Sequence, residues 1–221
     1  MPDYDAKTAL LVVDVQNDFA DPKGALYVRG GEEIISRINA EIADAKAAEA
    51  IVVYTQDWHP DTTPHFQKNG GVWPVHCVHD SWGAAFHPQL VVEPHAVIHK
   101  GSGGEDGYSA FSVRDPRSGE SSPTVLGELL RRHGIERVVI VGLATDYCVK
   151  ETALDARGLG FAAFAVEDAI RAVDLNGVAG EFQNELKVYG RAGQPCRRCR
   201  TPIETVKLSG RTAYYCPQCQ S

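Results

Sequence analysis

The sequence has no apolar run that approaches the roughly 18–20 residues needed to span a bilayer. Its first residues, Met-Pro-Asp-Tyr-Asp, lack the basic region with which a signal peptide begins. These absences predict a cytoplasmic protein with no membrane partner. Because thiols stay reduced in that compartment, we expect the six cysteines to be catalytic or metal-binding and not paired in disulfides.

Basic residues are scarce in most of the chain and become frequent near its end. The whole chain has 22 basic and 29 acidic residues, a net charge of −7. Residues 176–221 hold seven basic and three acidic residues, or +4, which leaves 15 basic and 26 acidic residues, or −11, for the first 175. An acidic body followed by a basic tail indicates two modules with different partners.

Strand and helix patterns alternate through the body. Continuous apolar runs predict strands over Thr8–Val13, Ile51–Thr55, Ala96–His99, Arg137–Gly142 and Phe161–Val166. Apolar residues at helical spacing predict helices over Glu33–Glu49, Thr124–His133 and about Asp146–Arg157. This order predicts an α/β fold in three layers, a doubly wound sheet of five parallel strands with helices on both faces.

Chemically active side chains follow several of these strands. Ligands of open parallel sheets bind outside the carboxyl ends of the strands, so we expect these side chains to lie close together. They are Asp14, Asp57, His59, Lys100 and Cys148.

Cys148 is the candidate nucleophile of this group. It begins a predicted helix, whose unpaired N–H groups and partial positive charge lower the pKa of a thiol and can hold an oxyanion. Asp14 would accept the thiol proton, and Lys100 would hold carboxylate and thiolate in place. Taken singly, Cys148 is more typical of a buried apolar position, and Asp14 is equally typical of a strand-end cap. Their convergence with Lys100 favours catalysis.

Asp57, His59 and His76 form a second group. One carboxylate and two imidazoles suit Zn²⁺, Fe²⁺ or Mn²⁺, and three protein ligands leave positions open for water or substrate. This pattern predicts a working divalent-metal site. His65 is either a further ligand, a residue that supports the ligands, or a surface histidine.

Six segments occur in an order typical of one enzyme family. They are Asp14-Val-Gln-Asn-Asp-Phe19, Asp57-Trp-His59, Trp73-Pro-Val-His76, His-Lys100-Gly, Tyr108-Ser-Ala-Phe111 and Ala144-Thr-Asp-Tyr-Cys148. On these segments the chain from about Thr8 to Leu175 resembles the nicotinamidases of the isochorismatase-like cysteine hydrolases. The resemblance implies hydrolysis of nicotinamide, or a related aromatic amide, to nicotinate and ammonia through a cysteine thioester.

The same resemblance implies a role for each site residue. Cys148 would be the nucleophile, Asp14 the base and Lys100 the third catalytic member. The metal held by Asp57, His59 and His76 would bind the pyridine nitrogen. The ring pocket would be lined by Phe19, Trp73 and Tyr108. A cis peptide in the region of Leu143, Ala144 and Thr145 would turn a backbone amide into the oxyanion hole, together with the amide of Cys148.

The tail carries a second metal pattern, Cys196-x2-Cys199-x16-Cys216-x2-Cys219. This spacing predicts a four-cysteine zinc ribbon with hairpins at Gln194–Arg200 and Ala213–Gln220. Because the segment has little apolar mass, zinc would supply its folding free energy.

From Gly180-Glu-Phe-Gln-Asn-Glu-Leu to Gly210-Arg211-Thr-Ala-Tyr-Tyr-Cys216, the tail resembles the C-terminal zinc finger of formamidopyrimidine-DNA glycosylase. The resemblance implies that Arg211 contacts the DNA backbone, and Arg197, Arg198 and Lys207 could add phosphate contacts. An incidental basic face is the alternative. The glycosylase's catalytic body is missing, so base excision is not expected. Arg200 stands where that family usually has glycine, which predicts a strained turn.

The join between the two resemblances lies near Leu175–Gly180. Nicotinamidases continue there through a last helix and a sixth strand, which this chain replaces with the tail. We therefore expect domains at 1–175 and 194–221, a connecting helix or linker at 176–193 with a helix over Val178–Val188, and an open edge on the fifth strand. A natural fusion, a recombination scar and an assembly artefact all stay open, as does a homo-oligomer.

Two functional hypotheses follow. In the first, the protein is an active nicotinamidase whose tail binds nucleic acid weakly or not at all. In the second, the body is an inactive scaffold for a DNA-binding tail. The complete set of catalytic and metal-ligand candidates favours the first.

Overall fold

The computed structural model describes residues 4–173, 192–196, 199–208 and 211–219, without the side chains of 206–208 and 211–214. The chain divides into two compact units, Tyr4–Val173 and a second one that runs from Asp174 to the end of the tail. The predicted helix over Val178–Val188 lies outside the described residues, so the domain bounds at 175 and 193 stay predictions. No helix within the described part of the chain is long and apolar enough to cross a membrane.

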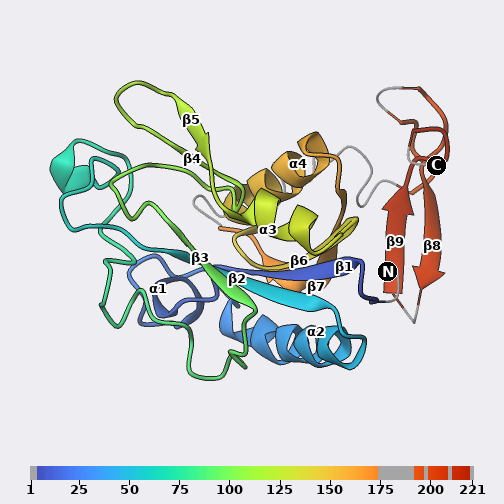
Figure 1. Ribbon diagram of the computed structural model, residues 1–221, viewed down its shortest axis with the longest axis horizontal. Helices are drawn as coiled ribbons and strands as arrows, with labels where there is room; N and C mark the ends of the chain where they lie inside the picture. Colours follow the sequence, from blue (N-terminus) through green and yellow to red (C-terminus); the bar gives the residue numbers. More distant parts are fainter. Residues whose placement is uncertain (1–3, 174–191, 197–198, 209–210, 220–221) are drawn as a thin grey trace. The chain divides into compact units, whose positions relative to one another are not determined.

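The larger unit is built on one five-stranded parallel sheet of order β3-β2-β1-β6-β7 (Figure 1). Its strands are β1 (Thr8–Val13), β2 (Ile51–Asp57), β3 (Ala96–Lys100), β6 (Arg137–Leu143) and β7 (Ala162–Arg171). The longer helices are α2 (Ile35–Ala47), α3 (Leu126–Arg132) and α4 (Lys150–Gly158). Figure 1 shows α2 on one side of the sheet and α3 and α4 on the other. The predicted fold class and strand number are confirmed.

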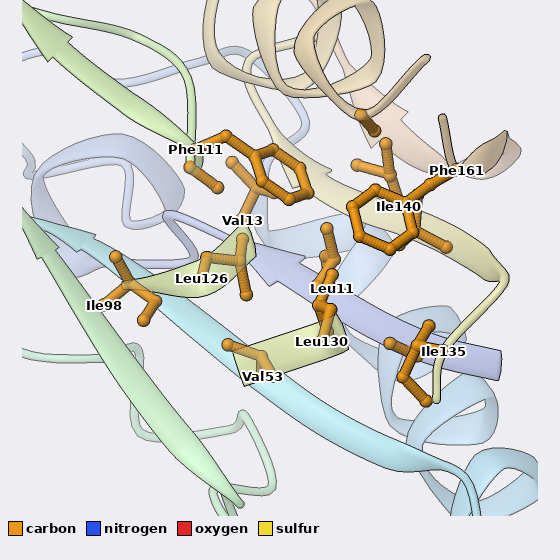
Figure 2. Close-up of a cluster of buried hydrophobic side chains, with 14 of the residues drawn as sticks. Leu11, Val13, Val53, Ile98, Phe111, Leu126, Leu130, Ile135, Ile140 and Phe161 are labelled. Atoms are coloured by element: carbon orange, nitrogen blue, oxygen red, sulfur yellow. The ribbon is translucent and has the colours of Figure 1, made fainter. Parts of the chain in front are cut away.

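Burial on both faces explains the apolar runs of the central strands. Every residue of β1 and β2 is buried, which is typical of a parallel sheet covered by helices. On one face, Leu11 and Val13 pack with Leu126 and Leu130 of α3 (Figure 2). The other face meets α2, whose buried isoleucines recur at helical spacing.

The strand order reverses between β1 and β6, and this is where the candidate site lies. In open α/β sheets such a reversal leaves a crevice at the carboxyl ends of the strands. Asp14 follows β1, and the helical turn η3 (Thr145–Val149) follows β6. The two strands approach so closely there that a Cβ on Gly142 would lie 2.0 Å from the Val13 carbonyl oxygen.

A small antiparallel hairpin, β4 (Ser112–Arg114) and β5 (Ser121–Pro123), was not predicted. Each strand has three residues, mostly polar and exposed or half-buried, so neither shows an alternating apolar pattern. The remaining short elements of this unit are α1 (Asn17–Ala20), η1 (Glu32–Ile34) and η2 (Gln67–Asn69).

Two strands of the tail, β8 (Glu204–Leu208) and β9 (Arg211–Tyr215), pair as an antiparallel hairpin. The first predicted hairpin, Gln194–Arg200, is found as a short knuckle, in which Pro195 forms an antiparallel bridge with Pro202 and the Cys196 N–H donates to the Thr201 carbonyl at 2.8 Å. The second, Ala213–Gln220, was wrong in position, because its first residues belong to β9. Each cysteine pair occupies a tight turn. The Arg200 N–H donates to the Cys196 carbonyl at 2.9 Å, and the Cys219 N–H donates to the Cys216 carbonyl at 3.1 Å.

Candidate active site and metal centre

Lys100 lies between two carboxylates at the carboxyl ends of the central strands. Its Nζ is 2.6 Å from Asp14 Oδ2 and 2.9 Å from Asp57 Oδ1, and its side chain is fully buried. Burial alone would lower the pKa of Lys100, but the two carboxylates outweigh it and raise that pKa well above its ordinary value. The lysine is therefore a permanent cation that joins the two predicted groups.

The two carboxylates differ in their ionisation. Burial raises the pKa of Asp14 above its ordinary value, although the Lys100 ammonium acts in the opposite direction. Burial would also raise the pKa of Asp57, but Lys100, followed by the neighbouring histidines, holds it well below its usual range. Asp14 is thus suited to exchange protons, whereas Asp57 stays a carboxylate. Asp14 is held by the Thr55 hydroxyl, which donates to its Oδ1 at 2.5 Å.

Cys148 lies in η3 with its Sγ near the same carboxylates. One ligand atom each from Cys148, Asp14 and Asp57 lies within 4.8 Å of the others. The prediction of a lowered thiol pKa was wrong. Burial raises the pKa of Cys148 well above its ordinary value, Lys100 offsets this only in part, and a hydrogen bond to Asp14 adds to the rise. The resting group is a neutral thiol with its acceptor already beside it.

The backbone before Cys148 has the predicted special geometry. The Leu143–Ala144 peptide bond is cis. The Ala144 carbonyl accepts the N–H groups of Tyr147 and Val149, each at 3.1 Å. Ala144 and Cys148 both line the pocket described below.

Three buried histidines gather beside Asp57. Nitrogens of His59, His65 and His76 lie within 4.8 Å of one another. Asp57 Oδ2 is 3.8 Å from Nε2 of His59 and 3.8 Å from Nε2 of His76. His65 is only 8% exposed, so it is not a surface histidine.

The hydrogen bonds of these rings fit a metal that the cluster would hold. Both ring nitrogens of His59 are buried without a hydrogen-bond partner, a costly state for polar atoms unless something else satisfies them. His76 Nδ1 lies 2.7 Å from the Pro74 carbonyl, and His65 Nδ1 lies 2.9 Å from Asp106 Oδ1. Each contact leaves Nε2 as the available ligand atom. Burial lowers the pKa of His76 to about 4, which keeps that imidazole neutral as a ligand must be.

An open pocket is lined by Cys148 and by two of the histidines, His65 and His76. The predicted ring-pocket residues Phe19, Trp73 and Tyr108 all line it. Trp73 Nε1 donates to the Tyr108 hydroxyl at 3.1 Å, which fixes the two rings relative to each other. Sequence reasoning missed the further lining residues Leu26, Tyr147 and Val173.

Gln16 is a site residue that sequence reasoning also missed. Its amide donates to the Asp57 carbonyl and accepts the Asp57 N–H, both at 2.8 Å. Gln16 therefore holds the backbone of a candidate metal ligand 41 positions away. The only signal in the sequence was its place two residues after Asp14.

The tail gathers its four cysteines as predicted. Their sulfurs lie within 4.8 Å of one another, with Cys199 Sγ 3.3 Å from Cys216 Sγ. Four thiols in this arrangement suit tetrahedral zinc. Arg200 has φ +68°, the left-handed conformation that favours glycine, as its unusual position predicted. The side chain of Arg211 and the whole of Arg197 and Arg198 lie outside the described residues.

Comparison with known proteins separates the body from the tail. Residues 8–187 match the isochorismatase domain family, and residues 193–221 match the zinc finger found in FPG and IleRS. The body is 39% identical to the nicotinamidase of Escherichia coli K12 over 184 residues, 76% of this chain and 84% of that protein. The crystal structure of Pyrococcus horikoshii pyrazinamidase in complex with zinc has a TM-score of 0.68 at 39% identity, covering 76% of this chain and 88% of that one.

The tail matches only a small part of its relatives. It is 57% identical over 47 residues to the formamidopyrimidine-DNA glycosylase of Nitratidesulfovibrio vulgaris, 21% of this chain and 13% of that protein. The comparison therefore concerns the zinc finger and not the rest of that enzyme.

Proposed function

This chain belongs to the isochorismatase domain family, and from its site we propose that it is a nicotinamidase, which hydrolyses nicotinamide and related aromatic amides to the acid and ammonia. One observation carries the proposal. Lys100 holds Asp14 at 2.6 Å, while the Cys148 sulfur lies within 4.8 Å of the same carboxylate in a pocket that also reaches buried histidines. The similarity to a nicotinamidase and a pyrazinamidase supports this substrate class.

Asp14 is the proton carrier of the reaction, and Cys148 is the nucleophile. As Sγ attacks the amide carbonyl carbon, the thiol proton passes to Asp14 and a C–S bond forms. Asp14 then protonates the amide nitrogen, the C–N bond breaks and ammonia leaves. Water attacks the thioester and gives a proton to Asp14. That proton returns to the thiolate as the C–S bond breaks and the acid is released.

The raised pKa values of Cys148 and Asp14 support proton transfer during attack, because the thiol is neutral before substrate binds. Lys100 remains charged throughout and balances the thiolate and the carboxylate in turn. The backbone N–H groups of Ala144 and Cys148 are assigned to the oxyanion, which lies at the start of the helical turn.

We assign the metal to Asp57, His59 and His76, with His65 as a further ligand. The buried, unpartnered nitrogens of His59 support this assignment. When bound, Zn²⁺, Fe²⁺ or Mn²⁺ would hold the ring nitrogen of the substrate and so orient its amide. Phe19, Trp73 and Tyr108 complete the ring pocket with apolar and aromatic surface.

The tail is proposed to hold one structural zinc through Cys196, Cys199, Cys216 and Cys219. Its similarity to a glycosylase zinc finger favours a second candidate function, weak binding of the nucleic-acid backbone through Arg211. The test is a duplex DNA shift that weakens with salt and weakens further in Arg211→Ala. A shift that Arg211→Ala leaves unchanged removes that role.

The enzymatic proposal is tested by ammonia release from nicotinamide. Wild-type protein supplied in turn with Zn²⁺, Fe²⁺ and Mn²⁺ should release ammonia, and Cys148→Ala should lose at least about 10⁴-fold in kcat. Cys77→Ala is the matched control, since Cys77 is also a free buried cysteine of the body. If the wild-type protein releases no ammonia with any of the three metals, the nicotinamidase proposal is wrong and the inactive-scaffold hypothesis is favoured.

A further inference from the structure

The carboxylate of Asp106 supports one of the three clustered histidines from outside the cluster. Asp106 Oδ1 lies 2.9 Å from His65 Nδ1. The His65 ring in turn stacks on His59, with centroids 4.9 Å apart and planes 24° apart. A change in the orientation of His65 would therefore disturb the packing of the neighbouring ring.

Asp106 is itself held in place by the β4–β5 hairpin. Its backbone N–H donates to the Arg114 carbonyl at 2.7 Å, and the Arg114 N–H donates to the Asp106 carbonyl at 2.5 Å. Its Oδ1 also accepts the Gly107 N–H at 2.8 Å, and Arg114 Nη2 lies 3.6 Å from its Oδ2. The backbone of Asp106 is thus fixed by its pairing with β4, and its carboxylate is held by contacts with Gly107 and Arg114.

His59, His65 and His76 differ in the hydrogen-bond partner of their Nδ1 atom. His76 has the Pro74 carbonyl, His59 has no hydrogen-bond partner, and His65 has the Asp106 carboxylate. A carboxylate that accepts Nδ1–H fixes the tautomer and makes the other nitrogen a better metal ligand.

We propose that Asp106 is a positioning residue of the metal centre, which holds His65 with Nε2 free to complete the ligand set of Asp57, His59 and His76. This inference rests on the proposed metal site. It also gives the β4–β5 hairpin a function: by pairing with the backbone of Asp106, the hairpin supports the carboxylate that orients His65.

The test is the affinity of the full-length chain for Mn²⁺. Protein stripped by a chelator first receives one equivalent of Zn²⁺, which the four thiolates prefer, and is then titrated with Mn²⁺, which suits oxygen and nitrogen ligands. Loss of the free-ion electron paramagnetic resonance signal reports binding. Asp106→Ala should bind Mn²⁺ about 10–100-fold more weakly than wild type, and Asp106→Asn, which keeps an acceptor oxygen, should fall between.

Two further variants separate positioning from general effects. Glu105→Gln removes the neighbouring negative charge, whose carboxylate accepts the Gly103 N–H, and should leave the affinity near that of wild type. In a His65→Ala background, Asp106→Ala should cause no further loss, because its effect passes through His65.

The outcomes distinguish this inference from the proposed function. Equal Mn²⁺ affinities of Asp106→Ala and Glu105→Gln, or an undiminished effect of Asp106→Ala without His65, overturn the positioning role and leave the nicotinamidase proposal intact. Wild-type protein that hydrolyses nicotinamide but binds no Mn²⁺ also overturns it. Wild-type protein that binds Mn²⁺ with the expected Asp106 dependence but releases no ammonia supports the inference and contradicts the proposed activity.

Discussion

The body and the tail each gather metal-type ligands, but they hold them by opposite means. In the body, the histidine cluster lies at the edge of a sheet with a large apolar core, which contains residues such as Leu11, Val53 and Ile140 (Figure 2). In the tail, the buried cluster consists of Cys196, Ile203 and Cys216, with the other two cysteines packed against it. On the proposed assignments, the metal of the body would serve chemistry and the metal of the tail would serve folding.

Chelation should therefore have its largest effect on the tail. The binding free energy of structural zinc in small fingers is about 10–16 kcal/mol, far more than one buried isoleucine can replace. After zinc is removed, amides of β8 and β9 should exchange with solvent at once, whereas those of β1 stay protected. Hydrogen exchange followed by mass spectrometry measures both in one sample. Persistent protection of β8 and β9 would mean that the tail has another source of stability.

Removal of the buried Lys100 cation should lower the free energy of unfolding of the body by a large fraction. Lys100→Met leaves Asp14 and Asp57 buried without their partner, so we expect a loss of about 3–5 kcal/mol in the free energy of unfolding. Lys7→Met is the control, because the Lys7–Glu136 pair is 61% and 62% exposed and should contribute little to the free energy of unfolding. Urea denaturation followed by tryptophan fluorescence compares them. Equal losses in the two variants contradict the role of burial.

A smaller effect should come from pH. The pKa of His76 is about 4 in the folded chain and 6.5 in the unfolded one. Between these values the unfolded chain alone binds a proton, so the free energy of unfolding of metal-free protein should fall as pH falls, by about 3 kcal/mol in total. His76→Asn should flatten this slope.

His133→Asn, which removes an exposed histidine, should keep the slope. Urea titrations at several pH values provide the measurement. An unchanged slope in His76→Asn assigns the acid sensitivity to other groups.

The smallest effect concerns the strained turn of the tail. Arg200→Gly should relieve about 1 kcal/mol of backbone strain at φ +68°, which corresponds to about five-fold tighter zinc binding. Glu49→Gly relieves the same conformation in the body, at φ +57°, and should leave the zinc affinity of the tail unchanged. Competition with a chromogenic chelator measures it. Zinc binding that is weaker in Arg200→Gly than in wild type contradicts a strained turn.

Sequence reasoning succeeded where one physical constraint governed a whole segment. Buried parallel strands are continuous apolar runs, so β1 was predicted with its observed bounds. Parallel strands also bring their carboxyl ends to one edge, which is why Asp14, Asp57 and Lys100 were expected together and are found in contact.

Sequence reasoning failed where a feature depends on contacts between distant residues or on how deeply a group is buried. Gln16 meets Asp57, and Asp106 meets His65, across 41 positions of the chain, and no local spacing signals either contact. The pKa of Cys148 was predicted too low because the helix terminus is visible in the sequence, whereas the depth of burial is not. The β4–β5 hairpin was missed because its short polar strands lack an apolar pattern.

The central claim is that Cys148 forms a covalent intermediate with the acyl group of nicotinamide. Protein mixed with nicotinamide, quenched with acid during turnover and digested should yield a nicotinoyl thioester on the peptide that contains Cys148, measured by mass spectrometry. The adduct should be absent from Cys148→Ala. Nicotinate that accumulates while Cys148 stays unmodified, or an adduct on Cys77 instead, would contradict the claim.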